Sequence, residues 1–174
     1  DAINLVGEYN FNLDNKIVYG IENEFDAAKY PTDATGSSPL YSDEAIYSQY
    51  FDYQFRPFEN LYTTIGFRKD RHTTAGDETT KRTTIAYKFN NNSKIRSSYG
   101  TGIRFPSLYD YFYGSTTVSK KEDLSAEKSE SFDIGYETYL DALNLGLNIS
   151  FFKLNYENPL VSQNRTDWMI KNAQ

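Results

Sequence analysis

The feature that most constrains this chain is an alternation of apolar and polar residues that recurs in segments of strand length. In residues 143–151, leucine, isoleucine and phenylalanine occupy every second position, and asparagine, glycine and serine lie between them. Successive side chains of a β-strand point to opposite faces, so such a segment forms a strand with one apolar and one polar face. The pattern favours strands over helices.

The same alternation predicts a series of strands along the whole chain. Its segments lie within residues 3–11, 17–25, 44–55, 61–68, 82–89, 94–103, 131–137 and 143–151, and a ninth is expected to start at 167–171. The composition agrees, since 16 Tyr and 12 Phe stand against only 5 Pro, and aromatic residues are enriched in strands. We therefore predict an all-β fold of eight or nine antiparallel, up-and-down strands.

The predicted connections alternate between short polar turns and long loops. Residues 12–15 and 90–93 are short turns, whereas residues 26–43 and 105–127 are long connections. Transmembrane β-barrels arrange their periplasmic turns and extracellular loops in this way. Three phenylalanines, Phe11, Phe55 and Phe89, each end a strand just before a short turn. On one face and at one end of the strands, they would form an aromatic girdle at a membrane interface.

The mean hydropathy of the chain is −0.68, and its sequence contains no apolar run near the ~18 residues that a membrane helix requires. A barrel strand needs only ~9 to 11 residues, of which every second one is apolar, so a transmembrane β-barrel is compatible with low hydropathy. A soluble β-barrel binding protein would show the same alternation with its apolar face inside. Strands of roughly ten residues exceed the usual length in soluble sheets and favour the membrane barrel.

Several classes of chemistry are disfavoured. The chain has no Cys, which excludes a disulfide framework, and its net charge of −6 argues against nucleic acid as a partner. His72, the only histidine, lies in a threonine-rich segment and is expected to be a solvated loop residue. No catalytic constellation can be built on it, so we do not expect an enzyme.

Acidic residues in one predicted loop are the weak candidates for a metal site. Asp26, Asp33, Asp43 and Glu44 could supply oxygen ligands to calcium. The simpler interpretation is that these are solvated loop carboxylates, and no other cofactor is expected.

Two segments resemble the barrel of TonB-dependent outer-membrane receptors. Residues 98–110 contain the step Arg104-Phe105-Pro106, which in that family leads from a strand into an extracellular loop. Residues 124–137 open with the pattern Leu-x-x-Glu-x-Ser at Leu124, Glu127 and Ser129. The resemblance is closest to receptors for cobalamin and siderophores.

The resemblance implies a barrel of about twenty-two strands in the outer membrane of a Gram-negative bacterium. It also implies a plug domain that contacts TonB and that residues 1–174 do not include. The chain is then a single domain, a part of the barrel wall surrounded by lipid, in a receptor that takes up a scarce, large nutrient such as cobalamin or a ferric siderophore. The alternative is an independent eight-stranded outer-membrane barrel with a binding or structural role, whose charged face would fill a narrow lumen.

The segment after the strand that ends near Arg104 holds the candidate ligand-binding residues. These are Arg104, Tyr109, Tyr111, Phe112 and Tyr113. Aromatic side chains supply rigid contact area at low entropic cost, as a recognition loop requires. The alternative is that these rings pack the loop or belong to an interfacial belt.

Overall fold

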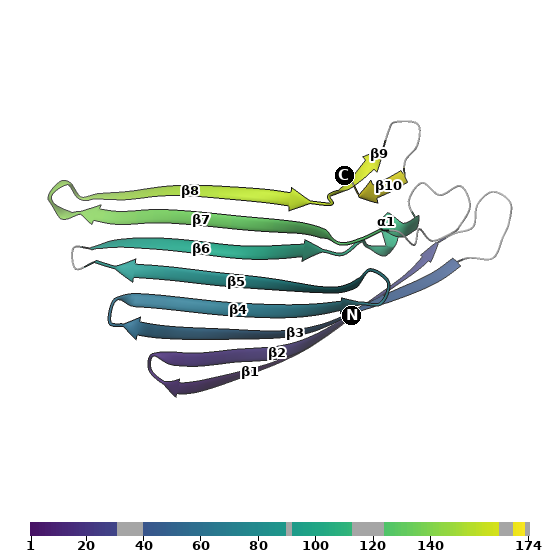
Figure 1. The fold of residues 1–174 in the computed structure, drawn as a ribbon, viewed down its shortest axis with the longest axis horizontal. Coiled ribbons are helices and arrows are strands. Elements are labelled where there is room, and N and C mark those ends of the chain that lie inside the picture. The colour runs from purple at the N-terminus through teal and green to yellow at the C-terminus, as the bar shows by residue number, and fades with distance from the viewer. Residues whose placement is uncertain (31–39, 90–91, 113–123, 164–168, 173–174) are drawn as a thin grey trace.

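A computed structural model of the chain describes residues 1–30, 40–89, 92–112, 124–163 and 169–172. It shows one extended, twisted layer of long strands, with the turns after residues 12, 58 and 140 at one end, and the connections after residues 30 and 104 together with the short turn after residue 72 at the other (Figure 1). We call these the short-turn end and the loop end.

Eight strands form a single sheet in which each is antiparallel to the next. They are β1 (Ala2–Asn12), β2 (Asn15–Tyr30), β3 (Leu40–Phe58), β4 (Leu61–His72), β5 (Gly76–Lys88), β6 (Ser93–Arg104), β7 (Glu127–Leu140) and β8 (Leu145–Glu157). This confirms the predicted all-β, up-and-down architecture. Within the described residues β1 and β8 do not pair, so the sheet is open. The alternative of an independent closed eight-stranded barrel is therefore wrong for this chain.

The remaining elements are short. They are α1 (Leu108–Phe112), the 3-10 turn η1 (Asp141–Leu143), β9 (Leu160–Gln163) and β10 (Met169–Asn172). The expected ninth strand is present as β10, but it pairs with β9 in a separate two-stranded sheet instead of extending the main one. Among the described helical segments, none has the length and apolar character to cross a membrane.

The strands are longer than the alternation predicts, and they extend into the expected loop at residues 26–43 and through His72, which was expected to lie in a loop. β2 and β3 contain 16 and 19 residues, and their ladder continues through Asp26↔Glu44 to Tyr30↔Leu40. β4 and β5 likewise pair as far as His72↔Gly76. Backbone hydrogen bonds hold a ladder together whatever the side chains are, so polar residues extend these strands beyond the apolar pattern.

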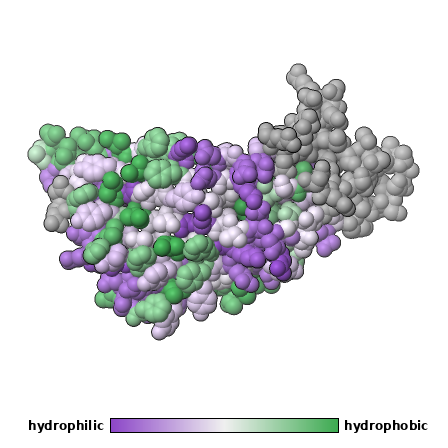
Figure 2. All heavy atoms as spheres, in the orientation of Figure 1, coloured by the Kyte–Doolittle hydropathy of each residue, from purple (hydrophilic) through white to green (hydrophobic). Residues whose placement is uncertain are grey.

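The two faces of the sheet differ in chemistry. One, which we call the apolar face, carries large exposed side chains such as Leu5, Tyr19, Phe67, Ile149 and Phe151. Ile149 is 69% exposed and Phe151 60%. Figure 2 shows hydrophobic side chains over the part nearer the short-turn end and a large hydrophilic group toward the loop end. So much exposed apolar surface argues against the soluble-barrel alternative and requires an apolar environment.

Aromatic pairs repeat along the short-turn end of the apolar face. Ring centroids lie 4.9 Å apart in Tyr9–Phe11, 4.9 Å in Tyr53–Phe55 and 5.0 Å in Tyr87–Phe89. Each pair occupies positions i and i+2 before a short turn, so both rings lie on the same face. The predicted row of Phe11, Phe55 and Phe89 is thus confirmed in its placement, and each phenylalanine has a tyrosine partner.

Candidate functional site

Charged side chains on the opposite, polar face form ion pairs that bridge strands. Arg68 donates to Glu22 at 2.9 Å and to Asp70 at 2.7 Å, and it also reaches the Ser48 hydroxyl at 2.8 Å. Arg82 holds both carboxylate oxygens of Asp52, at 3.0 and 2.7 Å. Arg96 contacts Asp133 and Glu137, and Lys94 also contacts Glu137, while Lys16 pairs with Glu8. The predicted charged face is therefore an ion-paired surface.

A glycine lets one of these pairs cross a whole strand. Gly66 of β4 lies between Asp52 of β3 and Arg82 of β5 in the two ladders. An added Cβ at this position would clash with the Asp52 carboxylate and would lie 3.0 Å from Cγ of Arg82. The absence of a side chain is therefore what allows the guanidinium to pass over β4 and reach the carboxylate.

The polar face is hollowed where these groups meet. A cleft of about 430 Å³ is lined by residues from β1 to β6, among them Asn4, Glu22, Tyr50, Asp52, Arg68 and Arg82. Apart from Lys81, its charged side chains already hold one another, so the cleft offers a hydrogen-bonding surface and no unpaired cluster of one sign.

The connection between β6 and β7 folds back onto the sheet. Pro106, Leu108, Tyr111, Leu124 and Ala126 are buried, and α1 contacts β2 and β3. β2 and β3 extend past the β4–β5 turn, since residues 40–45 of β3 pair with β2 beyond the last β3–β4 pair at Ile46↔His72. Figure 1 shows α1 at the loop end, near the end of β6 and the extended ends of β2 and β3. This packing, with Ala45 on β3, is the one substantial apolar core among the described residues.

His72 lies inside this packing and is not the solvated loop residue that was expected. Its ring centroid is 4.8 Å from that of Phe105, and its side chain is almost fully buried. Nδ1 accepts hydrogen bonds from the backbone N–H groups of Thr74, at 3.0 Å, and Ala75, at 2.9 Å. The histidine therefore shapes the β4–β5 turn and supports the loop. The expectation failed because the burial comes from a segment more than thirty residues away.

Glu44 is also buried, which corrects the expectation of a solvated carboxylate. Its Oε2 lies 3.4 Å from Nε2 of His72. Because Nδ1 of that histidine accepts two hydrogen bonds, the proton of the neutral ring is on Nε2, which leaves no lone pair there for a metal ion. Nearby, burial and then the carboxylates of Glu44 and Asp110 raise the pKa of Tyr111 to about 12.

Arg104 and Asp110 fix the start of the same connection. The Asp110 carboxylate accepts hydrogen bonds from the Ser107 N–H and hydroxyl, each at 2.9 Å, and lies 3.4 Å from the Arg104 guanidinium. Arg104 is also 3.6 Å from Glu127, at the start of β7. The guanidinium thus joins both ends of the connection, and its side chain remains 56% exposed.

The predicted ligand-binding residues have different environments. Tyr109 is 56% exposed, whereas Tyr111 is fully buried and packs the loop instead of presenting a surface. Phe112 ends α1, and nothing is described of its side chain, while Tyr113 lies outside the described residues. Arg104 and Tyr109 therefore remain as the accessible candidates, and ligand contact by them stays a prediction.

The four candidate calcium ligands do not converge where they are described. Asp26 pairs with Glu44 on the polar face, while Asp43 pairs with Ala27 and so lies on the opposite face. Asp33 falls outside the described residues. In the part of the chain that the structure describes, no three His, Asp or Glu side chains form a group that could hold a metal ion. Calcium binding stays a prediction.

Local sequence patterns missed the group formed by the buried Glu44 and His72 and the half-buried Phe105. These residues come from three separate segments, so no spacing connects them. The apolar residues in an otherwise polar connection, Leu108, Leu124 and Ala126, were the available signal that this connection packs against something.

The sequence itself identifies the family. The family described as "TonB dependent receptor-like, beta-barrel" matches residues 2–173, so the chain belongs to the β-barrels of TonB-dependent receptors. No curated protein sequence matches the chain.

Solved receptor structures share this fold. A variant of the ferric enterobactin receptor PfeA from Pseudomonas aeruginosa has a TM-score of 0.76 and 17% identity, over 98% of this chain and 31% of the receptor. The siderophore receptor PirA from the same organism has a TM-score of 0.77 and 17% identity, over 99% and 37%. The copper transporter OprC has a TM-score of 0.73 and 17% identity, over 97% and 31%. The chain thus spans about a third of the length of these proteins.

Proposed function

We propose that this chain is part of the barrel wall of an outer-membrane receptor that takes up a scarce nutrient in a Gram-negative bacterium. The observation that carries the proposal is the open sheet, whose apolar face has no covering layer among the described residues and whose other face is ion-paired. Lipid would cover the first face. A plug domain and water would meet the second, and TonB would act through that plug.

For the ligand we propose a large nutrient complex, with a ferric siderophore ahead of cobalamin. The similar structures include receptors whose names refer to siderophores. None of the three described above refers to cobalamin, although both ligands suit a wide barrel. The folded connection between β6 and β7 supports this proposal, because it lies at the loop end and combines a packed anchor with the exposed Tyr109.

The test measures binding of ferric enterobactin and of cyanocobalamin to the complete receptor. We expect ferric enterobactin to bind more tightly, and Tyr109→Ala to weaken binding at least tenfold, roughly 1.4 kcal/mol. Tyr9→Ala is a matched control, because Tyr9 is 59% exposed and Tyr109 56%, but Tyr9 lies at the short-turn end.

Two results would contradict the proposal. If the folded receptor bound neither probe, the proposed ligand class would be wrong. If Tyr109→Ala and Tyr9→Ala changed the affinity for ferric enterobactin equally, the β6–β7 connection would not be the recognition surface.

A further inference from the structure

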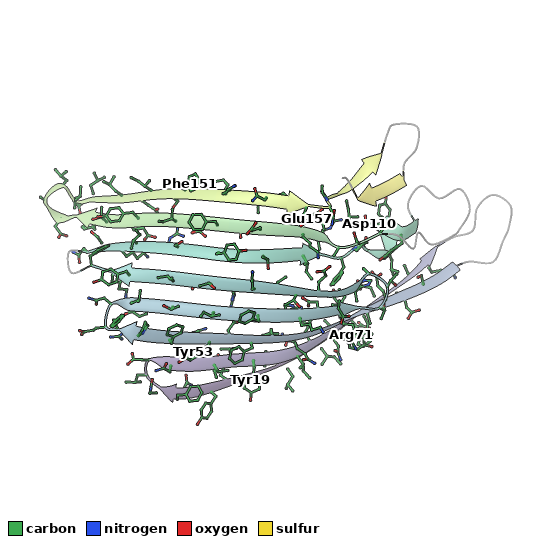
Figure 3. The ribbon with its side chains drawn as sticks, viewed as in Figure 1. Tyr19, Tyr53, Arg71, Asp110, Phe151 and Glu157 are labelled. Atoms are coloured by element: carbon green, nitrogen blue, oxygen red, sulfur yellow. The ribbon has the colours of Figure 1, made fainter. Side chains whose placement is uncertain are left out.

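The apolar face changes to a basic surface at the loop end of β4 and β5. Along β4, the side chains on this face are Leu61, Thr63, Ile65, Phe67, Lys69 and Arg71. Lys81 of β5 pairs directly with Phe67, the last apolar residue of that row. Along β4, positive charge therefore begins where the apolar row ends. We call Lys69, Arg71 and Lys81 the basic rim; Figure 3 shows Arg71 at the loop end of the sheet.

The basic rim has more positive charge than its neighbours neutralise. Asp77 forms ion pairs with two residues of the basic rim: Lys69 Nζ lies 3.4 Å from one carboxylate oxygen, and Arg71 Nε lies 3.2 Å from the other. Lys81 lies over the Tyr99 ring, 5.7 Å from its centroid, and takes part in no ion pair that is described. The nearby Glu130 accepts a hydrogen bond from the Tyr99 hydroxyl. This excess is notable in a chain of net charge −6.

The position of the rim fits the headgroup layer of a bilayer. At ~3.4 Å per residue, Lys69 and Arg71 lie about 7 and 14 Å along the strand beyond Phe67, and less than that in height because barrel strands are tilted. The polar layer on each side of the hydrocarbon is roughly 5 to 8 Å thick. Long basic side chains extend along apolar surface and place their charge in that layer.

We propose that the basic rim binds the phosphate-bearing headgroups of lipids in the leaflet that surrounds the loop end. Arginine and lysine together suit a phosphate, which can accept several hydrogen bonds from them. A lipid is the ligand because the cations border an apolar surface on the same face, so one molecule can place its headgroup on the rim and its acyl chains below it. This inference rests on the proposed insertion of the sheet in a membrane.

The experiment compares lipid association in the complete receptor, reconstituted in phosphatidylcholine, using spin-labelled phosphatidic acid and spin-labelled phosphatidylcholine. We expect the native receptor to associate more strongly with phosphatidic acid than with phosphatidylcholine. In the double variant Lys69→Gln with Lys81→Gln, the ratio of the two association constants should fall about tenfold. The matched control is Lys16→Gln with Lys88→Gln, which removes the same charge from the polar face at the short-turn end. Replacement of Lys69 and Lys81 by Arg should keep the preference.

The outcomes separate this inference from the proposed function. If the variant with Lys69→Gln and Lys81→Gln and the control variant preferred phosphatidic acid over phosphatidylcholine equally, the basic rim would not be the binding surface. Competition by free inorganic phosphate as strong as that by the lipid would overturn the choice of a lipid ligand. Heat-modifiable migration reports barrel insertion independently, so failure of the native receptor to insert would count against the proposed function instead.

Discussion

Replacement of Ile149 by arginine tests which face of the sheet meets lipid. On β8, Leu145, Leu147, Ile149 and Phe151 share the apolar face, and Lys153 is the first charged residue of that row. From Leu145 to Lys153 the strand covers about 27 Å at ~3.4 Å per residue, which at a tilt of ~35–45° is roughly 20 Å in height, most of the ~25 Å apolar band of such barrels. Ile149 lies in the middle, four residues from either end, so its charged replacement would lie near the centre of the bilayer.

The expected cost of Ile149→Arg is about 2 to 4 kcal/mol, the penalty for arginine at the midplane of an outer-membrane barrel. Asn148→Arg is the adjacent control. Asn148 pairs with Glu137 on the polar face, so a new guanidinium meets water and a carboxylate there, and the cost should be about 1 kcal/mol or less.

The assay is the equilibrium between folded and unfolded receptor in lipid vesicles, titrated with guanidinium chloride. Folding should be reported by the heat-modifiable band, which does not depend on ligand. Equal penalties for Ile149→Arg and Asn148→Arg, or a larger one for Asn148→Arg, would refute the assignment of the apolar face to lipid.

Three further predictions concern packing. Gly20→Ala should destabilise the barrel by about 1 to 3 kcal/mol in the same assay, because its Cβ would overlap the Tyr50 ring and lie 2.7 Å from the Leu5 carbonyl oxygen. The control Gly100→Ala should be neutral or slightly stabilising, because no atom lies nearer than 3.7 Å to the added Cβ. Tyr111→Ala should expose the β6–β7 connection to limited proteolysis while Tyr111→Phe does not, since the ring fills the buried anchor. Because the pKa of Tyr111 is raised to about 12 in the folded chain, its contribution to stability is complete below pH ~10 and is lost as pH rises toward 12. The absorbance of tyrosinate should include a late titration whose amplitude falls by one residue in Tyr111→Phe, and an unchanged amplitude would contradict the assignment.

The order of the strands could be predicted from the sequence because the relevant signal is local. The alternation in residues 143–151 assigns a strand and both of its faces without reference to any other segment. Strand ends could not be predicted in this way. Asp26 and Glu44 continue a ladder outside the apolar pattern, and only the pairing of β2 with β3 reveals it.

The candidate site was predicted less well because it depends on contacts between distant segments. The aromatic composition of the β6–β7 connection indicated both recognition and packing, and only the folded chain separates the exposed Tyr109 from the buried Tyr111. His72 illustrates the same limit. Its neighbours in the sequence are polar, but its neighbours in space are Phe105 and Glu44.

The ion pair that crosses Gly66 has a consequence for how the strands find their partners during assembly. A slip of one strand by two residues keeps every side chain on its proper face, so face chemistry alone cannot reject it. Such a slip of β4 would bring Thr64 or Arg68 opposite Arg82 in place of Gly66. The first would put a side chain in the path of the guanidinium, and the second would put two cations side by side. Asp52, Gly66 and Arg82 together therefore favour the observed register of β3, β4 and β5 over registers shifted by two residues.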